Sequence, residues 1–164
     1  MKFRELGGIL CMRGASMRMK GVVYKACVRS MLTYGTETWA MKAGVFQRLR
    51  VTERRMIRMI CGVTLKDMVE STAIASRVGV DDLEEHLRQK RLRWFGHIVR
   101  RDKEVEIKKV FELKIEEQRK RGRPVKRWID VVEEDMKKRG VLQQDAVDRE
   151  GWRRRAVKEL ANSH

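Results

Sequence analysis

Apolar residues recur every three to four positions along most of the chain, the spacing that places side chains on one face of a helix. Five segments carry such a stripe. The stripes are Val23, Cys27, Met31 and Tyr34; Phe46, Leu49, Met56 and Ile60; Leu83, Leu87, Trp94 and Ile98; Val125, Trp128, Val132 and Met136; and Ala146, Trp152, Ala156 and Leu160. Because the 164 residues include a single proline, the pattern predicts an all-α fold, an irregular bundle of about six or seven helices.

Residues typical of helix starts lie between the stripes and support this division. Three pairs have the spacing of N-terminal capping boxes, in which two residues cap one helix start. They are Thr64 with Asp67, Asp81 with Glu84, and Asp145 with Asp148. The type of residues 104–113 stays open, because their apolar residues fit both helical and alternating spacing. Residues 114–123 lack an apolar stripe, which predicts a basic loop.

The charge of the chain is strongly positive, and it is unevenly placed. Lys and Arg number 39 against 23 Asp and Glu, a formal net charge of +16. Residues 88–128 contribute +10 of this, residues 1–87 contribute +6, and residues 129–164 are neutral. Such an excess attracts polyanions, chiefly nucleic acid and secondarily anionic membrane surfaces.

The cysteines and the apolar runs exclude several classes of protein. Cys11, Cys27 and Cys61 stand far apart, so the sequence predicts neither a disulfide framework nor a zinc knuckle. No apolar run approaches the ~20 residues that span a bilayer, and the first residues lack the apolar stretch of a secretion signal. We therefore expect a soluble chain in the cytosol or nucleus, without a membrane partner or a cofactor.

The segment 81–101 is the first candidate site. Its apolar stripe leaves the other sides of the helix to Arg88, Lys90, Arg91, Arg93, Arg100 and Arg101. Arginine predominates, and acids are nearly absent from residues 88–101. Both features favour phosphate binding over a face that is merely solvated.

The stretch RKRGRPVKRW is the second candidate site. Its core, Arg121-Gly122-Arg123-Pro124, resembles an AT-hook, which lies in the narrow minor groove of A·T-rich DNA. The flanking cations are Lys120, Lys126 and Arg127. Two other interpretations stay open: the stretch binds phosphates without regard to sequence, or Pro124 is simply the first residue of the following helix.

Other constellations have structural explanations that compete with chemistry. Asp81 and Asp82 resemble a polymerase metal pair, but they precede a predicted helix, whose first turn both acids would cap. His86 and His97 are about 16 Å apart along one helix, too far to share a metal ion. His97 could stack on a base, donate to a phosphate, or pack partly buried. The four tryptophans are expected to be core anchors, and one that proves exposed could stack on single-stranded bases. The sequence predicts no catalytic residue and no metal ligand.

Five blocks in order give the chain a recognisable pattern. They read YGTETWAM, MIRMICGV, RQKRLRWFGHIVRR, GRPVKRWIDVVEEDM and DREGWRRRAV. Together they resemble the C-terminal region of non-LTR retrotransposon reverse transcriptases, from about Val22 onward. The resemblance implies a thumb-like helical segment at 1–62, a basic helical segment at 63–113, and a basic loop with a C-terminal helical pair at 114–164. In that family the palm and its metal-binding aspartates lie upstream of these blocks, so this chain is expected not to be an enzyme.

These observations predict a non-catalytic, nucleic-acid-binding fragment of an RNA-directed DNA polymerase. It would grip template RNA, target DNA or their hybrid through backbone phosphates. The upstream polymerase domains, supplied in trans, are a candidate partner. Three alternatives stay open: an AT-hook-like chromatin protein, a helical interaction module whose charge keeps it soluble, and a decayed element without a selected function.

Overall fold

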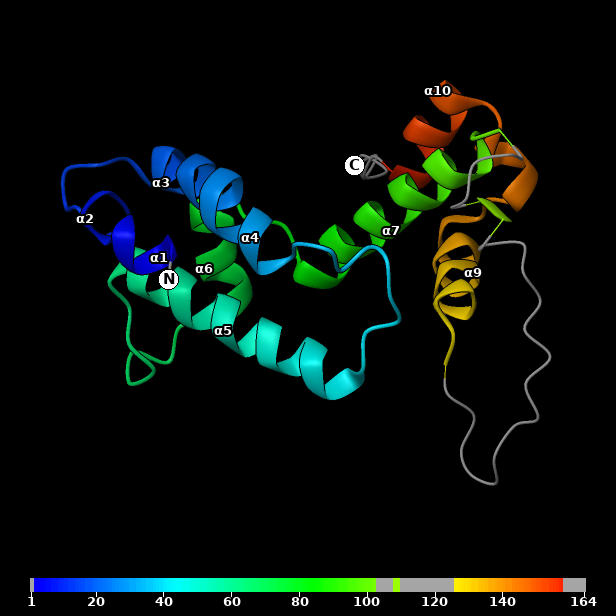
Figure 1. Ribbon diagram of the computed structural model, residues 1–164. Coiled ribbons are helices and arrows are strands. Elements are labelled where there is room, and N and C mark those ends of the chain that lie inside the picture. The colour runs from blue at the N-terminus through cyan, green and yellow to red at the C-terminus, as the bar shows by residue number, and fades with distance from the viewer. Residues whose placement is uncertain (1, 103–107, 110–125, 158–164) are drawn as a thin grey trace. The chain divides into compact units, whose positions relative to one another are not determined.

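A computed structural model describes residues 2–102, 108–109 and 126–157 (Figure 1). These residues form helices and turns without a strand, which confirms the all-α class. The chain divides into two compact units, the first made of residues 1–35 and 41–86, the second of residues 36–40 and 87–164. The predicted boundary at residue 62 lies inside the first unit, where helices on both sides of it pack together.

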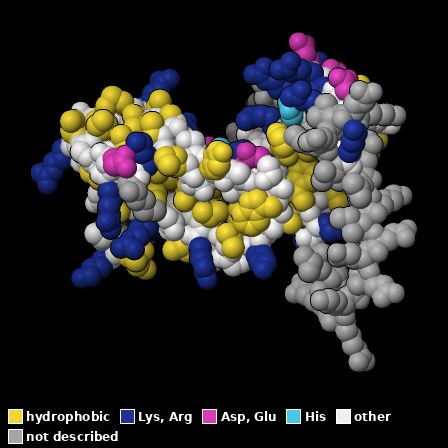
Figure 2. Space-filling view, in the orientation of Figure 1, with side chains coloured by type: hydrophobic (Ala, Val, Ile, Leu, Met, Phe, Trp, Pro, Cys, Tyr) yellow, Lys and Arg dark blue, Asp and Glu magenta, His cyan; other side chains and the backbone are white. Residues whose placement is uncertain are grey.

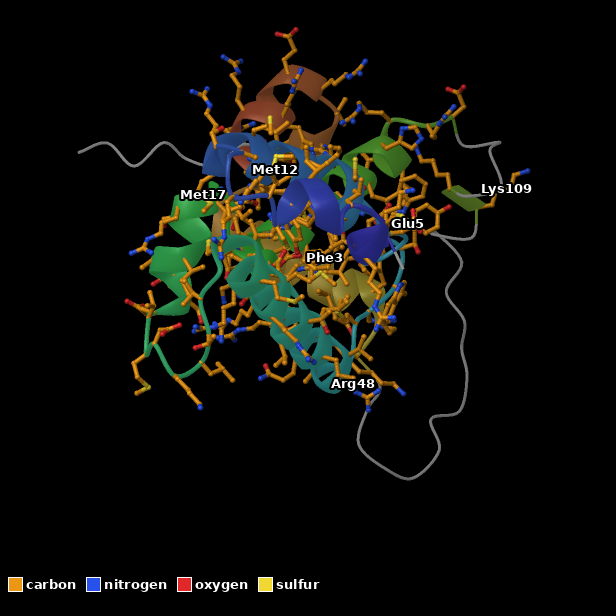
Figure 3. All side chains as sticks on the ribbon, turned by 90° about the vertical axis from the view of Figure 1, so that its left-hand side faces the viewer. Phe3, Glu5, Met12, Met17, Arg48 and Lys109 are labelled. Atoms are coloured by element: carbon orange, nitrogen blue, oxygen red, sulfur yellow. The ribbon has the colours of Figure 1, made fainter. Side chains whose placement is uncertain are left out.

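The first unit contains most of the short helices and one long one. Its elements are α1 (Lys2–Glu5), α2 (Gly7–Leu10), α3 (Met17–Val23), the π-helix η1 (Tyr24–Arg29), α4 (Ser30–Leu32), α5 (Ala43–Cys61) and α6 (Ser71–Val78). They enclose a core of Phe3, Leu10, Tyr24, Val28, Met56, Ile57, Ile60, Ile74, Val78 and Val80. Phe3, labelled in Figure 3, is the residue that α1 adds to this core.

A π-helix changes which residues of the first stripe are buried. Its wider turn shifts the register of the side chains relative to an α-helix. Tyr24 and Val28 are buried, whereas Met31 and Tyr34, which the 3.6-residue period places on the inner face, are 62% and 88% exposed. The predicted stripe is therefore wrong at its C-terminal end.

Close contact between α3 and α6 depends on Gly21. A Cβ atom at this position would lie 1.8 Å from the backbone oxygen of Val78. Only glycine allows the two helices to approach to this distance, and the approach seals the side of the core where Val78 is 1% exposed.

A buried ion-pair network crosses the first unit. Arg29, 1% exposed, places Nε 2.9 Å from Glu53 Oε1 and Nη1 2.7 Å from Asp81 Oδ1. The Tyr24 hydroxyl donates to Glu53. Burial raises the pKa of the Glu53 carboxyl above its ordinary value, and the neighbouring Arg29 opposes that shift without cancelling it. Asp81 thus serves tertiary packing.

The observed helix starts correct the three predicted capping boxes. Asp82, not Asp81, caps α7 (Leu83–Val99), because its side chain accepts from the amides of Glu84 and Glu85. Thr64 and Asp67 do bond to each other, but they close a turn, and the next helix, α6, begins only at Ser71.

The same correction applies near the C-terminus. Asp148 caps α10 (Arg149–Trp152) by accepting from the Glu150 amide. Asp145 instead accepts from the Leu142 amide at the start of the 3₁₀-helix η2 (Gln143–Ala146). Of the three predicted pairs, only Thr64 and Asp67 bond to each other; the aspartates of the other two pairs bond to other residues.

The second unit is built around most of α7. Residues 87–99 of that helix pack with α9 (Trp128–Arg139), η2, α10 and the π-helix η3 (Arg153–Val157). The buried core contains Leu92, Phe95, Val132, Met136, Val141, Ala146, Trp152, Ala156 and Val157. Residues 36–40 join this unit through the Trp128 indole, which donates to the Glu37 carbonyl at 2.7 Å.

Trp152 is the central anchor of the second unit. It is 1% exposed, packs against Phe95 with ring centroids 5.8 Å apart, and donates from Nε1 to the Leu92 carbonyl at 2.9 Å. Gly96 makes room for it, since a Cβ there would lie 2.6 Å from Trp152 Nε1. This packing brings the C-terminal helices alongside α7.

Candidate nucleic-acid interface

A basic pocket lies where α7 meets α10 and η3, all within the second unit. Its lining consists of Arg93, His97, Arg100, Arg149, Trp152, Arg153 and Val157. Its volume is about 340 Å³. Four arginines therefore line the pocket together with a buried tryptophan and a buried valine, and no acidic residue of the described chain lines it.

The Arg100 guanidinium is fixed in place within this basic pocket. Its Nη1 donates to the Ala146 carbonyl at 2.7 Å, and a Cβ on Gly96 would lie only 2.9 Å from the same nitrogen. Burial lowers the pKa of Arg100 from its ordinary value, and the charge of Arg149 adds to that effect. An anion bound beside Arg100 would relieve this repulsion.

The remaining arginines of the basic pocket are available to a ligand. Arg93, Arg149 and Arg153 are exposed, and they have no ion pair with any residue of the described ranges. Guanidinium groups present planar forks that match phosphate oxygens. Figure 2 shows Lys and Arg side chains gathered beside a His in the region of α7 and α10. The arrangement suits a phosphate.

Two of the predicted binding residues, Arg88 and Arg91, form ion pairs inside the second unit. Arg91 Nε lies 2.6 Å from Asp135 Oδ2, and Arg88 Nε lies 3.3 Å from Asp135 Oδ1. Both arginines are largely covered, and Asp135 is 4% exposed. This cluster joins α7 to α9, so the two side chains contribute to packing inside the second unit.

Other predicted cations differ in their surroundings. Arg101 donates from Nε to His97 Nε2 at 3.2 Å, and Lys90 lies 2.8 Å from Glu37 Oε2. Lys126 pairs with Glu134 at the exposed surface. Of the six cations predicted on the long basic helix, the structure brings Arg93 and Arg100 together in the basic pocket.

The AT-hook-like stretch lies mostly outside the described residues. Lys120, Arg121, Gly122, Arg123 and Pro124 fall within residues 110–125, to which the structural description does not extend. Arg127 is described: its backbone amide donates to Asp130 Oδ2 at 2.8 Å, just before α9 begins. The minor-groove interpretation thus remains a prediction.

Arg149 and Arg153 are functional candidates that the sequence reasoning missed. They lie in residues 129–164, whose net charge is zero, so net charge did not point to a basic site there. Their spacing of four residues places both on one side of a helical turn, and the helical phase set by buried Trp152 identifies that side. This periodicity was the signal available in DREGWRRR.

A pocket in the first unit is a weaker candidate. Arg50, Arg54 and Arg58 line it together with serine and threonine residues of α6. Glu53, Asp81 and Asp82 also line it, and Arg58 donates to the Val69 and Thr64 carbonyls. Because three acids offset three arginines, this pocket offers an anion much less attraction than the basic pocket does.

Neither a metal-binding cluster nor a membrane-spanning helix occurs among the residues that the structure describes. No group of three His, Cys, Asp or Glu side chains there could hold a metal ion. His86 lies 3.9 Å from Asp81 and contacts Thr33, a packing arrangement. No helix among the described residues is both long and apolar enough to cross a bilayer.

Comparison with known proteins gives one informative likeness. The chain is similar to a transposon-derived protein of Caenorhabditis elegans, with 29% identity over 83 residues, which cover 48% of this chain and 30% of that protein. This chain therefore matches less than a third of that relative's length. No family model matches the chain, and no solved structure matches it. The likeness indicates a transposon-related origin.

Proposed function

We propose that the protein is a nucleic-acid-binding, non-catalytic fragment of a retrotransposon RNA-directed DNA polymerase. It grips the sugar-phosphate backbone of RNA, DNA or their hybrid. The observation that carries the proposal is the basic pocket, in which four arginines converge without an acid among its lining. The transposon-derived relative supports the same origin.

The binding mode follows from the chemistry of the basic pocket. Guanidinium groups aimed at phosphate oxygens position a strand without reading its bases. Each phosphate neutralised releases condensed counterions, so binding weakens steeply as salt rises. Arg93, Arg149 and Arg153 supply the exposed contacts, and Arg100, fixed by Ala146, supplies a preorganised one.

The first unit offers a surface for the upstream polymerase domains. Its exposed apolar side chains include Ile9, Met12, Met17, Met19, Val22 and Met31. Figure 2 shows apolar side chains gathered over the part of the first unit that contains α2 and α3, and a contiguous apolar patch is typical of an interaction surface. Supplied in trans, the palm-containing part of the polymerase is the partner that the resemblance implies for this face.

A salt titration with paired variants tests the proposal. Arg153 and Arg154 are neighbours in η3 and are both exposed, but only Arg153 lines the basic pocket. Arg153→Ala and Arg154→Ala therefore remove the same charge at nearly the same place. We expect Arg153→Ala to lower the magnitude of the slope of log affinity against log salt by about 1, and Arg154→Ala to change it much less.

Four labelled ligands of equal length distinguish the remaining alternatives. They are A·T-rich duplex, G·C-rich duplex, single-stranded RNA and RNA·DNA hybrid. Equal loss on both duplexes after Arg153→Ala supports the phosphate grip. Strong preference for the A·T-rich duplex, lost in an Arg121→Ala, Arg123→Ala variant, would support the AT-hook-like chromatin protein. A flat salt response on all four ligands would refute nucleic-acid binding and favour the interaction module.

A further inference from the structure

A second hollow on α7 borders the basic pocket. It is lined by Glu37, Lys90, Arg93, Trp94 and His97, all residues of the second unit. Arg93 and His97 line both hollows. A ligand that enters one hollow therefore lies within reach of side chains that also face the other.

The second hollow contains an aromatic pair. The rings of Trp94 and His97 stack with centroids 5.4 Å apart and an interplanar angle of 22°. Arg101 donates to His97 Nε2 at 3.2 Å, which holds the imidazole in place and leaves Nδ1–H as its donor. Because each ring covers one face of the other, a base would stack on the outer face of the Trp94–His97 pair, as bases stack on exposed aromatic side chains.

Trp94 is not part of the packed core, which distinguishes it from Trp152. Among the described residues, the core of the second unit and the half-buried side chains packed against it do not include Trp94. Trp152 is 1% exposed and uses its indole N–H to bond the Leu92 carbonyl. Trp94 is half-buried and lines a hollow.

We propose that the second hollow takes one unpaired nucleobase while the adjoining phosphate binds in the basic pocket. The ligand of the site is then single-stranded nucleic acid rather than a closed duplex. The inference rests on the proposed function, because it assumes that the basic pocket binds phosphate. In a duplex both faces of each internal base are covered by its neighbours, so only an unpaired or terminal base can offer a face to Trp94.

Variants at Trp94 test the base site without altering charge. Trp94→Leu keeps apolar volume but removes the ring, whereas Trp94→Phe keeps a ring. The probes are a 12-nucleotide single-stranded DNA, the same strand with abasic residues throughout, and a duplex of the same length whose two ends are closed by hairpin loops of abasic residues, so that it has no terminal base pair with an open face. Circular dichroism and the urea midpoint of each variant report whether the second unit stays folded.

We expect Trp94→Leu to weaken binding of the normal single strand by about 5- to 150-fold, and Trp94→Phe to weaken it by less than about 5-fold. The abasic strand should bind the wild type and Trp94→Leu alike, and the duplex should not respond to the substitution. Equal affinity of wild type and Trp94→Leu for the normal strand, or an equal loss on the duplex, would overturn the base site.

Failure of this inference is distinguishable from failure of the proposed function. If Arg153→Ala still reduces the salt slope while Trp94→Leu has no effect, the phosphate grip stands and only the base site is refuted. If neither variant changes binding and the salt response is flat, the proposed function fails, and the base site fails with it.

Discussion

Substitution of Gly21 by alanine probes the packing of the first unit most directly. The new Cβ would lie 1.8 Å from the Val78 backbone oxygen and 3.3 Å from its Cγ1. Non-bonded carbon and oxygen atoms stay roughly 3 Å or more apart, so α3 and α6 must separate by more than about 1 Å. A gap of that size forfeits about a quarter to a half of the attraction between the atoms concerned.

Two effects of opposite sign determine the result. Replacing a glycine in a helix interior by alanine stabilises the helix by up to about 1 kcal/mol. Overpacking costs about 1–3 kcal/mol or more. The upper end of this range applies here because the clashing atom belongs to the Val78 backbone, which cannot rotate away as a side chain can. We therefore expect Gly21→Ala to lower the free energy of unfolding of the first unit by about 2 kcal/mol.

Gly44 provides a matched control in the same unit. It lies in α5, and a Cβ there would meet nothing within 4 Å, so Gly44→Ala should leave stability unchanged or raise it by up to about 1 kcal/mol. Urea unfolding followed by far-UV circular dichroism compares the variants. Tryptophan fluorescence reports the second unit separately, since all four tryptophans belong to it. A Gly21→Ala protein as stable as Gly44→Ala would refute the close-approach argument.

Two further predictions concern the buried charges. Burial raises the pKa of the Glu53 carboxyl in the folded protein. Protonation of Glu53 therefore favours the folded state: this stabilisation is fully present below the pKa of the unfolded chain, about 4.3, and is lost as pH rises through the pKa of the folded protein. The wild type should lose stability relative to Glu53→Gln as pH rises from about 4 to 7 in urea titrations; a relative gain would mean that Arg29 dominates. Asp135→Ala strands two largely covered arginines and should cost the second unit about 3–5 kcal/mol, whereas Glu134→Ala at the exposed surface should cost at most about 1 kcal/mol, both measured by tryptophan fluorescence in urea.

The sequence predicted the helical class and the basic character of α7, because both depend on local periodicity and charge. It could not predict which cations would be free. Arg91 and Arg93 are both arginines of one helix, yet Arg91 is held by Asp135 and Arg93 lines the basic pocket. The difference arises because Asp135, which binds Arg91, belongs to α9 and lies 44 positions further along the chain.

Local spacing also failed where the helix itself departs from the α form. The 3.6-residue period placed Met31 and Tyr34 inward, but the π-helix η1 shifts the register before them. Arg149 and Arg153 belonged to a block whose net charge is zero. Their role becomes visible once Trp152 fixes which side of α10 faces α7.

The distribution of methionines between surface and interior has a practical consequence. Met31 and Met68 are 62% and 89% exposed, whereas Met56 and Met136 are each 7% exposed; Met12 and Met17, labelled in Figure 3, are exposed as well. Mild peroxide converts accessible thioethers to sulfoxides and spares covered ones. Mass spectrometry of oxidised peptides would therefore record which methionines a bound partner shields, with the two buried residues as internal references for an intact fold.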